Sequence, residues 1–537
     1  MLRMLLALIG GSVALAGAAE ARPDATAQAQ PKLKPRPVTA TTFVFSGRGW
    51  GHGVGLSQYG ALGLAGEGRT YAEILAHYYS GTELSQAPVA RVRVLVAEAK
   101  ATVTVSSEEP FRVRDASGET HALPALAVKL GRGLELDLPG GRRRLEGPLV
   151  FLPGKAPLEV GAPYRGRIEV SVTGTKLNAV NDVGLEQYLA GVVPDEMPAA
   201  WHPEALKAQA VAARSYALAH RVSGKGFDLY ADVRSQVYGG LEAEDPRATA
   251  AIAATAGEVV TYGGKVANTL FHSTSGGRTA SAEEAFGTSV PYLVPVDDPH
   301  SASSPVHSWG PVAVTDVVAR KGLKLGTPVT GIRLAKAPSG RVGSAVVTTT
   351  MGARTVTGGQ LRSGLGLRST WITRFTPLSL SRPGGPVVYG GTVTVRADAR
   401  GARGVRLLRR SGRSWSEARA QPAGGTFAVK VKVTEPTAFR LSVGALRGSV
   451  LTVPVAPRVK ATRTPLGIAG SVAPAREGAV VQVQRLQGVH WVTVGQATVS
   501  AAGAYTAELP LDPGAYRARV APAGGFVQGL SATVDVG

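Results

Sequence analysis

Cysteine is absent from the 537 residues of this chain, and methionine occurs only four times. Without cysteine the chain can form no disulfide, no thiolate metal site and no thiol nucleophile. A metal would have to be held by histidine and carboxylate side chains, and neither HExxH nor another ligand spacing occurs among the histidines. We therefore predict a fold that depends on packed cores, with no metal and no cofactor.

Long apolar runs are also scarce. One run, Met4–Gly17, follows the basic Arg3 and ends in the small-residue stretch 19–21, which is typical of a secretory signal. It is too short to span a bilayer comfortably, and no later segment approaches about 18 consecutive apolar residues. We expect residues 1–21 to be a signal peptide and the mature protein to be secreted to the cell envelope, either the cell wall or the periplasm.

Acidic residues are too few to balance the basic ones. The chain has 38 Asp and Glu against 59 Lys and Arg, a formal net charge of +21. Such a charge favours acidic partners such as phosphate-rich wall polymers, anionic lipid surfaces or nucleic acid. An Arg-rich composition spread evenly over the surface explains it equally well. With no basic tail and no aromatic-basic alternation, we predict no nucleic-acid partner.

The length suggests three or four domains of about 150 residues each. Changes in composition and periodicity predict an α+β core with a β-rich insertion, followed by two all-β Ig-like sandwich domains. The predicted segments are 1–21 (signal peptide), 22–40 (Pro-rich linker), 41–87 (Gly-dense part of the core), 88–173 (β-rich insertion), 174–377 (main part of the core), 378–458 (first sandwich) and 459–537 (second sandwich).

Local signals predict several elements of the core. A strand over TTFVF is followed by a Gly-dense string and a short helix over residues 71–79. Asp182 is placed to cap a helix, Pro203 begins a long helix to about Val222, and Asp245 opens another. Gly263-Gly264 is predicted to be the turn of a hairpin.

The two C-terminal sandwiches are predicted from a repeat. The strings VRLLRRSGRSW, TFAVKV and AFRLSV of residues 405–443 recur as VQVQRLQGVHW, AYTAEL and AYRARV in residues 481–520. Neither half contains a cluster of acids and bases. We interpret both as binding or spacer modules.

Glu196 is the strongest candidate for chemistry. It lies in the segment VVPDEMP, and Trp201 follows five positions later. Apolar neighbours disfavour the charged form of a carboxyl group and raise its pKa, as a general acid near neutral pH requires. The alternative is that Asp195 and Glu196 only decorate a helix N-terminus, where the dipole stabilises acids.

The helix that follows offers Lys207, Arg214 and Tyr216, which its apolar stripe leaves on other faces. Arg214 is a candidate to hold a substrate carboxylate or amide, and Tyr216 to stack on a sugar. Side chains of these types on helices are more often solvated or structural.

Two histidine segments are further candidates. His272 precedes a turn whose Ser273 and Ser275 supply hydroxyls, and it could ligate a metal, bind a sugar or sit in the core. His52 lies in the Gly-dense string, where glycines let the backbone approach a ligand closely, and Gln58 follows in the same string. These glycines match neither the dinucleotide nor the phosphate-loop spacing.

Five strings are too specific in combination to arise by chance: GWGHGVGLSQYGA, NDVGLEQYLAGVVPDEMP, EALKAQAVAARSYAL, SQVYGG and FHSTSGGRT. Together they resemble the stage II sporulation protein D family, also called the SpoIID/LytB family. The resemblance covers roughly residues 41–85 and 165–375.

The resemblance implies a peptidoglycan lytic transglycosylase whose catalytic acid is Glu196. Such an enzyme cleaves MurNAc-GlcNAc glycan strands without water and leaves 1,6-anhydromuramyl ends. One carboxylate serves both steps because it alternates its protonation state. The muramyl lactyl group is acidic, and Arg214 or Lys207 is a plausible counter-charge. Tyr216, His272, Ser273, Ser275, His52 and Gln58 complete the expected substrate-binding set.

The resemblance also leaves an alternative. Some relatives are described as enhancers of an amidase, so the alternative function is a non-catalytic wall-binding protein that enhances an amidase. The implied partners are glycan strands, with acidic wall polymers or a membrane-anchored wall-remodelling protein as further candidates.

The chain departs from the family pattern in two places. Some members carry cysteines before QVY and resemble zinc binders that also use the FHS histidine. Here Tyr230 and Ser235 occupy that segment, so we predict no zinc and give His272 a substrate or structural role. The GHGVG string often follows the EMP segment in relatives but precedes it here. If both build one cleft, the β-rich region must be an insertion between them.

Overall fold

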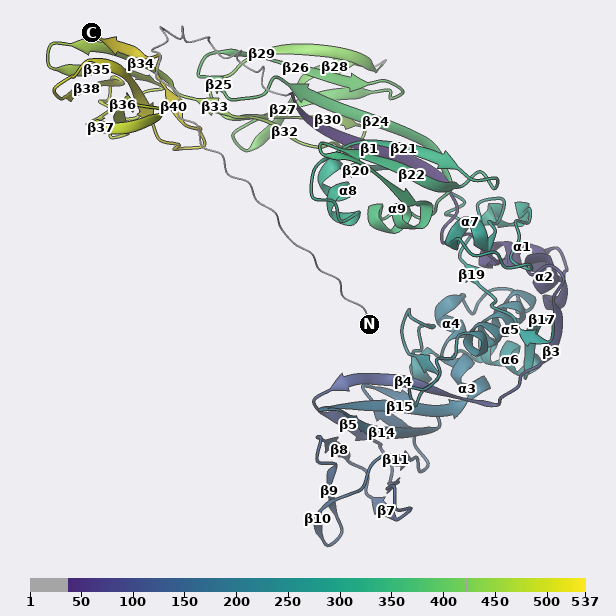
Figure 1. Cartoon of the computed structure of the whole chain (residues 1–537). Coiled ribbons are helices and arrows are strands. Elements are labelled where there is room, and N and C mark those ends of the chain that lie inside the picture. Colours follow the sequence, from purple (N-terminus) through teal and green to yellow (C-terminus); the bar gives the residue numbers. More distant parts are fainter. Residues whose placement is uncertain (1–36, 422–423) are drawn as a thin grey trace, which may run out of the picture.

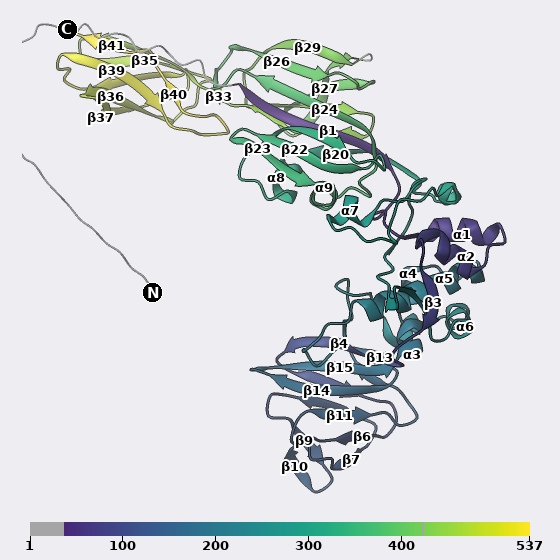
Figure 2. The same ribbon diagram turned by 45° about the vertical axis from the view of Figure 1, so that its right-hand side comes forward.

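The computed structural model describes residues 37–421 and 424–537, so the predicted signal peptide and most of the predicted linker lie outside the described residues. The described chain forms a curved row of units, with a β lobe at one end, helices in the middle and β sheets toward the C-terminus (Figure 1 and Figure 2). Its content of 46% strand and 16% helix is compatible with the predicted α+β core and all-β units. No helix in these ranges is long and apolar enough to cross a membrane.

The helical core is built around α5 (Pro203–Ala219), which is buried on most of its faces. The sequence predicted one apolar stripe, yet Gln209 and Arg214 outside that stripe have no exposed surface either. Six of its alanines are fully buried, and such small side chains let neighbouring elements approach from several sides. The helices that pack against it are α1 (Gln58–Gly66), α2 (Tyr71–Tyr78), α3 (Leu185–Ala190), α4 (Val193–Glu196) and α6 (Pro246–Ala254).

Most of the local predictions in the core are confirmed. The side chain of Asp245 caps α6, a capping box at Thr70 begins α2, and Gly263-Gly264 joins β17 (Glu258–Tyr262) to β18 (Lys265–Val266). Helix α1 was not predicted, because its glycines suggested a loop. A Cβ on Gly60 would meet the Tyr78 hydroxyl at 2.0 Å, so the glycines serve close packing inside a helix.

Asp182 does not cap a helix. It lies in β15 (Lys176–Gly184), and α3 begins only after Gly184. Its carboxylate accepts hydrogen bonds from Arg91 and Arg167 on the flanking strands. The predicted cap is therefore wrong, because cross-strand cations supply partners that the local sequence does not reveal.

The β lobe contains a seven-stranded sheet of order β16-β4-β15-β14-β11-β6-β7 and a four-stranded sheet of order β13-β12-β5-β8. Val113, Phe151, Leu158 and Ile168 contribute to one apolar core. Strands β15 and β16 come from outside the predicted insertion, so inserted and core segments share one sheet. The strands are β4 (Arg91–Lys100), β5 (Val103–Ser106), β6 (Phe111–Arg114), β7 (Thr120–Leu123), β8 (Ala127–Leu130), β9 (Glu135–Leu138), β10 (Gly141–Arg144), β11 (Leu149–Leu152), β12 (Leu158–Val160), β13 (Ala162–Tyr164), β14 (Arg167–Thr173) and β16 (Leu229–Tyr230).

The first described strand, β1 (Val38–Arg48), belongs to the C-terminal half of the molecule. It lies between β20 (Ser308–Thr315) and β24 (Ile372–Arg382) and is antiparallel to both. Phe43 and Phe45 are fully buried in a core with a three-stranded sheet and two helices. Those elements are β21 (Val329–Lys336), β22 (Val342–Thr349), β23 (Gly352–Thr357), α8 (Asp316–Gly322) and α9 (Gly358–Leu365).

The same sheet continues from β24 into β26 (Thr392–Ala399) and β29 (Gly425–Lys432). It faces a second sheet across an apolar core that includes Leu380 and Phe439. The predicted boundary between residues 377 and 378 therefore falls inside β24. The second sheet contains β27 (Val405–Ser411), β28 (Ser414–Gln421), β30 (Thr437–Val443), β31 (Leu446–Arg447) and β32 (Leu451–Val453).

The last unit repeats this arrangement. Its strand order β37-β36-β39 matches β28-β27-β30, and Arg485 lies opposite Tyr516 as Arg409 lies opposite Phe439. This register confirms the predicted alignment of the two halves. The strands are β34 (Arg458–Thr464), β35 (Gly467–Ala473), β36 (Val480–Gln487), β37 (His490–Thr498), β38 (Ala504–Glu508), β39 (Gly514–Val520), β40 (Gly529–Leu530) and β41 (Val534–Val536).

Candidate functional site

A cavity of about 230 Å³ lies where the helical core meets the segment after β16. Glu196 is the one carboxylate among its lining residues, and the rings of His52 and Tyr216 lie in the same wall. The remaining lining residues are Val233, Ser235, Gln236, Val237, Leu270 and Phe271. The Gly-dense loop, the α4–α5 region and the FHS strand thus meet around one acid.

The backbone of Glu196 is fixed from both sides. Glu196 ends α4, a single helical turn followed by the fully buried Met197. Gln58 donates a hydrogen bond from Nε2 to the carbonyl oxygen of Glu196 at 2.8 Å, and the Gln209 Oε1 atom lies 3.4 Å from the same nitrogen. Gln58 was expected to bind substrate, but it is buried and positions Glu196 instead.

The Glu196 side chain is held in a way that favours its protonated form. Burial, and then the nearby carboxylate of Asp195, raise the pKa of Glu196. Among the described residues, no hydrogen-bond donor reaches the Glu196 carboxylate. A carboxyl group in these surroundings keeps its proton to a higher pH than a solvent-exposed one, and it can give that proton up and take it back.

Tyr216, on α5, lines the same cavity as Glu196. Its ring stacks on His220 with centroids 4.0 Å apart and lies edge-on to Phe271 at 6.0 Å. Burial, followed by the Glu196 charge, raises the pKa of Tyr216. The Tyr216 hydroxyl therefore stays protonated and can donate a hydrogen bond within the cavity.

The Gly-dense loop is tied to the FHS segment by backbone pairing. β2 (Leu56–Ser57) runs parallel to β19 (Phe271–His272), and Trp50 bridges to Thr274. The two histidine rings lie 5.4 Å apart. His52 Nδ1 accepts from the Val54 N–H, whereas His272 Nδ1 lies 3.1 Å from the Val54 carbonyl oxygen and must carry the proton.

Both histidines are neutral at ordinary pH. Burial, and then the charge of Arg362, lower the pKa of His52 to about 4. Burial, and then His52, lower the pKa of His272 well below its usual value. His272 does not line the cavity, and its buried Nε2 has no partner among the described residues.

The two predicted cations do not reach the cavity. Arg214 is fully buried, and its guanidinium donates to Glu186 and to the carbonyl oxygen of Glu258. Lys207 lies on another face of α5, where its ammonium pairs with Glu204 at 2.7 Å. Neither residue supplies a counter-charge to this cavity, because Arg214 is turned into the core toward Glu186 and the half-buried Lys207 pairs with Glu204.

The two serines of the FHS turn lie outside this cavity. Ser275 is fully buried and donates from Oγ to Asp298 at 2.5 Å. The carbonyl oxygen of Ser273 accepts from the Tyr59 N–H at 3.0 Å. Neither serine lines the cavity; the buried Ser275 hydroxyl is used by Asp298, whereas a substrate contact of the half-buried Ser273 stays a prediction.

The loop of residues 233–237, for which the sequence predicted no role, supplies four of the lining residues. Val233 is 87% exposed and Val237 is 43% exposed. Exposed valines in a polar loop beside a cavity offer an apolar surface to a ligand. The SQVYGG string marked this segment, but its valines could not be placed without the fold.

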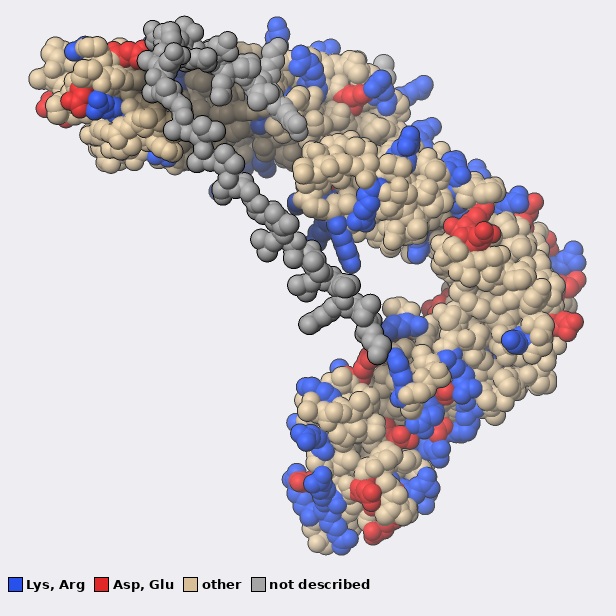
Figure 3. Space-filling view, in the orientation of Figure 1, with Lys and Arg blue, Asp and Glu red and all other residues tan. Residues whose placement is uncertain are grey.

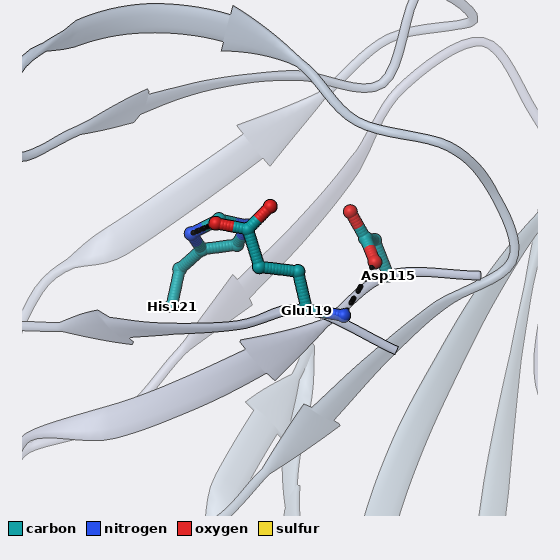
Figure 4. Close-up of side chains that lie close together, drawn as sticks. All are labelled: Asp115, Glu119 and His121. Atoms are coloured by element: carbon teal, nitrogen blue, oxygen red, sulfur yellow. Dashed lines mark hydrogen bonds and ion pairs between the residues drawn. The ribbon is translucent and has the colours of Figure 1, made fainter. Parts of the chain in front are cut away.

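Three side chains at ligand distance from one another lie away from the cavity, in the turn between β6 and β7. Asp115, Glu119 and His121 present ligand atoms within 4.8 Å of one another (Figure 4). Asp115 already accepts from the Ser117 hydroxyl and the Glu119 N–H, and Glu119 lies 3.6 Å from His121. These contacts account for the cluster as a polar turn of the β lobe.

Glycine at position 53 lets Arg341 lie against the Gly-dense loop. A Cβ there would meet the guanidinium carbon at 2.5 Å, and the φ of Gly53 is +87°. We expect Gly53→Ala to lower the free energy of unfolding by about 2–4 kcal/mol, because overlap adds to backbone strain. The matched control is Gly81→Ala, with φ of +69° and no described atom within 4 Å, which should cost only about 1 kcal/mol. Urea denaturation followed by tryptophan fluorescence measures both, and equal losses would contradict the steric role.

Part of the chain that builds this site is similar to known proteins. The family described as Stage II sporulation protein, SpoIID, matches residues 173–262. An uncharacterized protein of Brachyspira hyodysenteriae is 34% identical over 211 residues, which are 38% of this chain and 56% of that protein. Stage II sporulation protein D of Bacillus subtilis is 33% identical over 220 residues, 38% of this chain and 63% of that protein.

A further relative has a different name. The Amidase enhancer of Bacillus subtilis is 39% identical over 110 residues, which are 20% of this chain and 15% of that protein. In each of these comparisons the match spans less than two thirds of the relative's own length.

Proposed function

Because this chain belongs to the SpoIID/LytB family, we propose that it is a secreted peptidoglycan lytic transglycosylase with Glu196 as its single acid and base. The observation that carries the proposal is the lone carboxylate in the cavity wall. Hydrolytic glycosidases use two carboxylates about 5–10 Å apart, one of which activates water or attacks the sugar. A reaction that needs one carboxylate twice fits this cavity better.

The proposed reaction begins with protonated Glu196. It gives its proton to the oxygen that links the anomeric carbon of N-acetylmuramic acid to N-acetylglucosamine, and that bond breaks with its electron pair on the leaving oxygen. The oxygen of the muramyl 6-hydroxyl then bonds to the anomeric carbon, and the Glu196 carboxylate takes the proton of that hydroxyl. The product is a 1,6-anhydro sugar, and Glu196 is protonated again.

Basic surface supports an acidic polymer of the wall as a further partner. Figure 3 shows Lys and Arg side chains on all units of the face in view, including the end of the β lobe. The hairpin of β9 and β10 carries the exposed Arg142, Arg143 and Arg144. The predicted signal peptide supports a location in the cell envelope.

A second candidate function is supported by the match to the Amidase enhancer. In that function the cavity binds a glycan strand without cutting it, and the chain increases the activity of an amidase. Glu196 would then contact sugar without transferring a proton.

The product of the native chain tests both candidates. Purified sacculi, with and without stem peptides, are digested in water enriched in oxygen-18, and the fragments are analysed by mass spectrometry. Anhydromuramyl ends without the label are the expected result. Reducing ends that carry the oxygen-18 label would show that water attacks the anomeric carbon, and the chain would then be a hydrolase. Uncut strands together with faster cleavage by an added amidase would favour the second candidate.

The pH profile should reflect Glu196 and its neighbour. Because the first step needs a protonated carboxyl, the rate should fall as the pH rises through the raised pKa of Glu196. Asp195→Asn removes one of the two causes of that raised pKa, so the falling limb should move to lower pH with the maximal rate unchanged. The matched control is Asp535→Asn, an exposed acid in the last unit. Turbidity loss of sacculi across the pH range measures the shift, and an unmoved limb in Asp195→Asn would contradict the assignment.

A further inference from the structure

A second cavity lies behind His52, which also lines the cavity of Glu196. Its volume is about 90 Å³, several times the about 10–15 Å³ that one water molecule needs. Phe286, which is 54% exposed, lies with its ring 5.5 Å from that of His52. The lining residues are His52, Ala280, Glu284, Ala285, Phe286, Ala337, Arg341, Val342, Gly359, Arg362 and Thr370.

This cavity contains buried charges that the described residues leave incompletely paired. Arg341 is 2% exposed, and only its Nη2 donates, to the carbonyl oxygens of Ser275 and Arg278. Its Nε and Nη1 atoms are buried and have no partner among the described residues. Buried donors of a charged group are costly when unpaired, so the pair of free guanidinium nitrogens indicates a missing acceptor.

Glu284, in the wall of the same cavity, has a buried acceptor that lacks a donor. Its Oε1 atom accepts from the Ser339 N–H at 3.0 Å, whereas Oε2 is buried without a described partner. Glu284 and Arg341 form no ion pair within 4.0 Å among the described residues, although the Glu284 charge acts on Arg341. A ligand that satisfies both groups therefore needs an acceptor at one point and a donor at another.

The remaining wall limits the ligand further. Arg341 and Arg362 outnumber Glu284 as charged residues, and His52 is neutral, so the cavity carries an excess positive charge. Such a charge favours a negatively charged ligand. Ala280, Ala285 and Val342 make part of the wall apolar, which suits a short apolar group.

We propose that this cavity binds an alanine-type group, with its carboxylate on Arg341, its nitrogen-bound hydrogen on Glu284 and its methyl group on the apolar wall. The same chemistry occurs in a free amino acid and in the C-terminal alanine of a peptide. The inference goes beyond the proposed function, because it concerns a second cavity and does not depend on cleavage by Glu196.

Calorimetric titration of the full chain separates the two sources. The probes are alanine and N-acetylalanine, each in both enantiomers, with N-acetylalaninamide and propionate as comparisons. We expect saturable binding of at least one carboxylate probe, with the N-acetyl compound tighter if the source is a peptide and free alanine tighter if it is an amino acid. The amide lacks the carboxylate and propionate lacks a hydrogen-bond donor, so each should bind at least about tenfold more weakly. No saturable binding of any alanine probe would mean a water-filled cavity and would overturn the proposal.

A cavity-filling variant tests the location. A Cβ on Gly359 would lie 3.7 Å from its nearest neighbour, the carbonyl oxygen of Ala285, so Gly359→Leu can extend into the cavity from α9. It should weaken binding at least about tenfold, whereas Gly66→Leu on the exposed end of α1 should not change it. Circular dichroism checks folding, and Arg362→Gln serves as a second variant that should also weaken binding. Unchanged affinity in folded Gly359→Leu would overturn the proposed location.

Discussion

Glu196→Gln should lower the rate of glycan cleavage by about 10²–10⁴-fold, the range expected when a general acid and base is removed. Glutamine keeps the shape of the side chain but cannot transfer the proton that both steps require. The backbone contacts of Glu196 with Gln58 and Val192 use main-chain atoms, so the turn should remain intact. The measurement is the rate at which anhydromuramyl ends appear in digests of sacculi.

Asp195→Asn is the matched control for this loss. Asp195 is the neighbouring acid, it is exposed, and it does not line the cavity. Its variant should keep full activity at acidic pH. Co-sedimentation with sacculi should show that Glu196→Gln still binds glycan. Native activity in Glu196→Gln would exclude Glu196 as the acid, and an unchanged effect on an added amidase would favour the second candidate.

Glu186→Ala should lower the free energy of unfolding by about 3–5 kcal/mol, because it leaves a fully buried guanidinium without its charged partner. Arg214 has no exposed surface, whereas the Glu186 side chain is 36% exposed. Water can therefore hydrate Glu186 when Arg214 is removed, and the Gly257 N–H still donates to it. Arg214→Met should accordingly cost less, about 1–3 kcal/mol for the carbonyl oxygens left without a donor.

Denaturation in urea, followed by circular dichroism of the helices, measures whether Glu186→Ala lowers the free energy of unfolding more than Arg214→Met. Glu135→Ala is the matched control, because Glu135 pairs with Arg142 at an exposed position of the β lobe. An exposed pair of this kind contributes at most about 1 kcal/mol. If Arg214→Met lowered the free energy of unfolding more than Glu186→Ala, the packing of the Arg214 side chain would contribute more to stability than its ion pair with Glu186.

The sequence predicted those elements whose signals are local. The cap of α6 at Asp245 and the glycine turn of the hairpin each depend on neighbouring residues in the chain. The role of Asp182 and the burial of Arg214 depend on partners 15 to 91 residues away. A polar residue on a helix or strand does not reveal whether such a distant partner will draw it into the core.

The candidate site shows the same division. Glu196, His52 and Tyr216 could be named from their motifs, and they line one cavity. The valines of residues 233–237 lack a local signature that distinguishes them from ordinary loop residues, and so does Arg341 of the second cavity. Arg341 is far from Gly53 in sequence and can lie against the Gly-dense loop because Gly53 has no side chain.

The position of β1 between β20 and β24 bears on how the protein reaches its native state. As the polypeptide emerges from its N-terminal end, Phe43 and Phe45 appear long before residues 308–315 and 372–382 exist to cover them. Contacts between residues so far apart in sequence form slowly, and until they form the exposed apolar surface makes folding intermediates prone to aggregate. A chaperone that shields this first strand until synthesis has passed β24 should therefore raise the yield of folded protein.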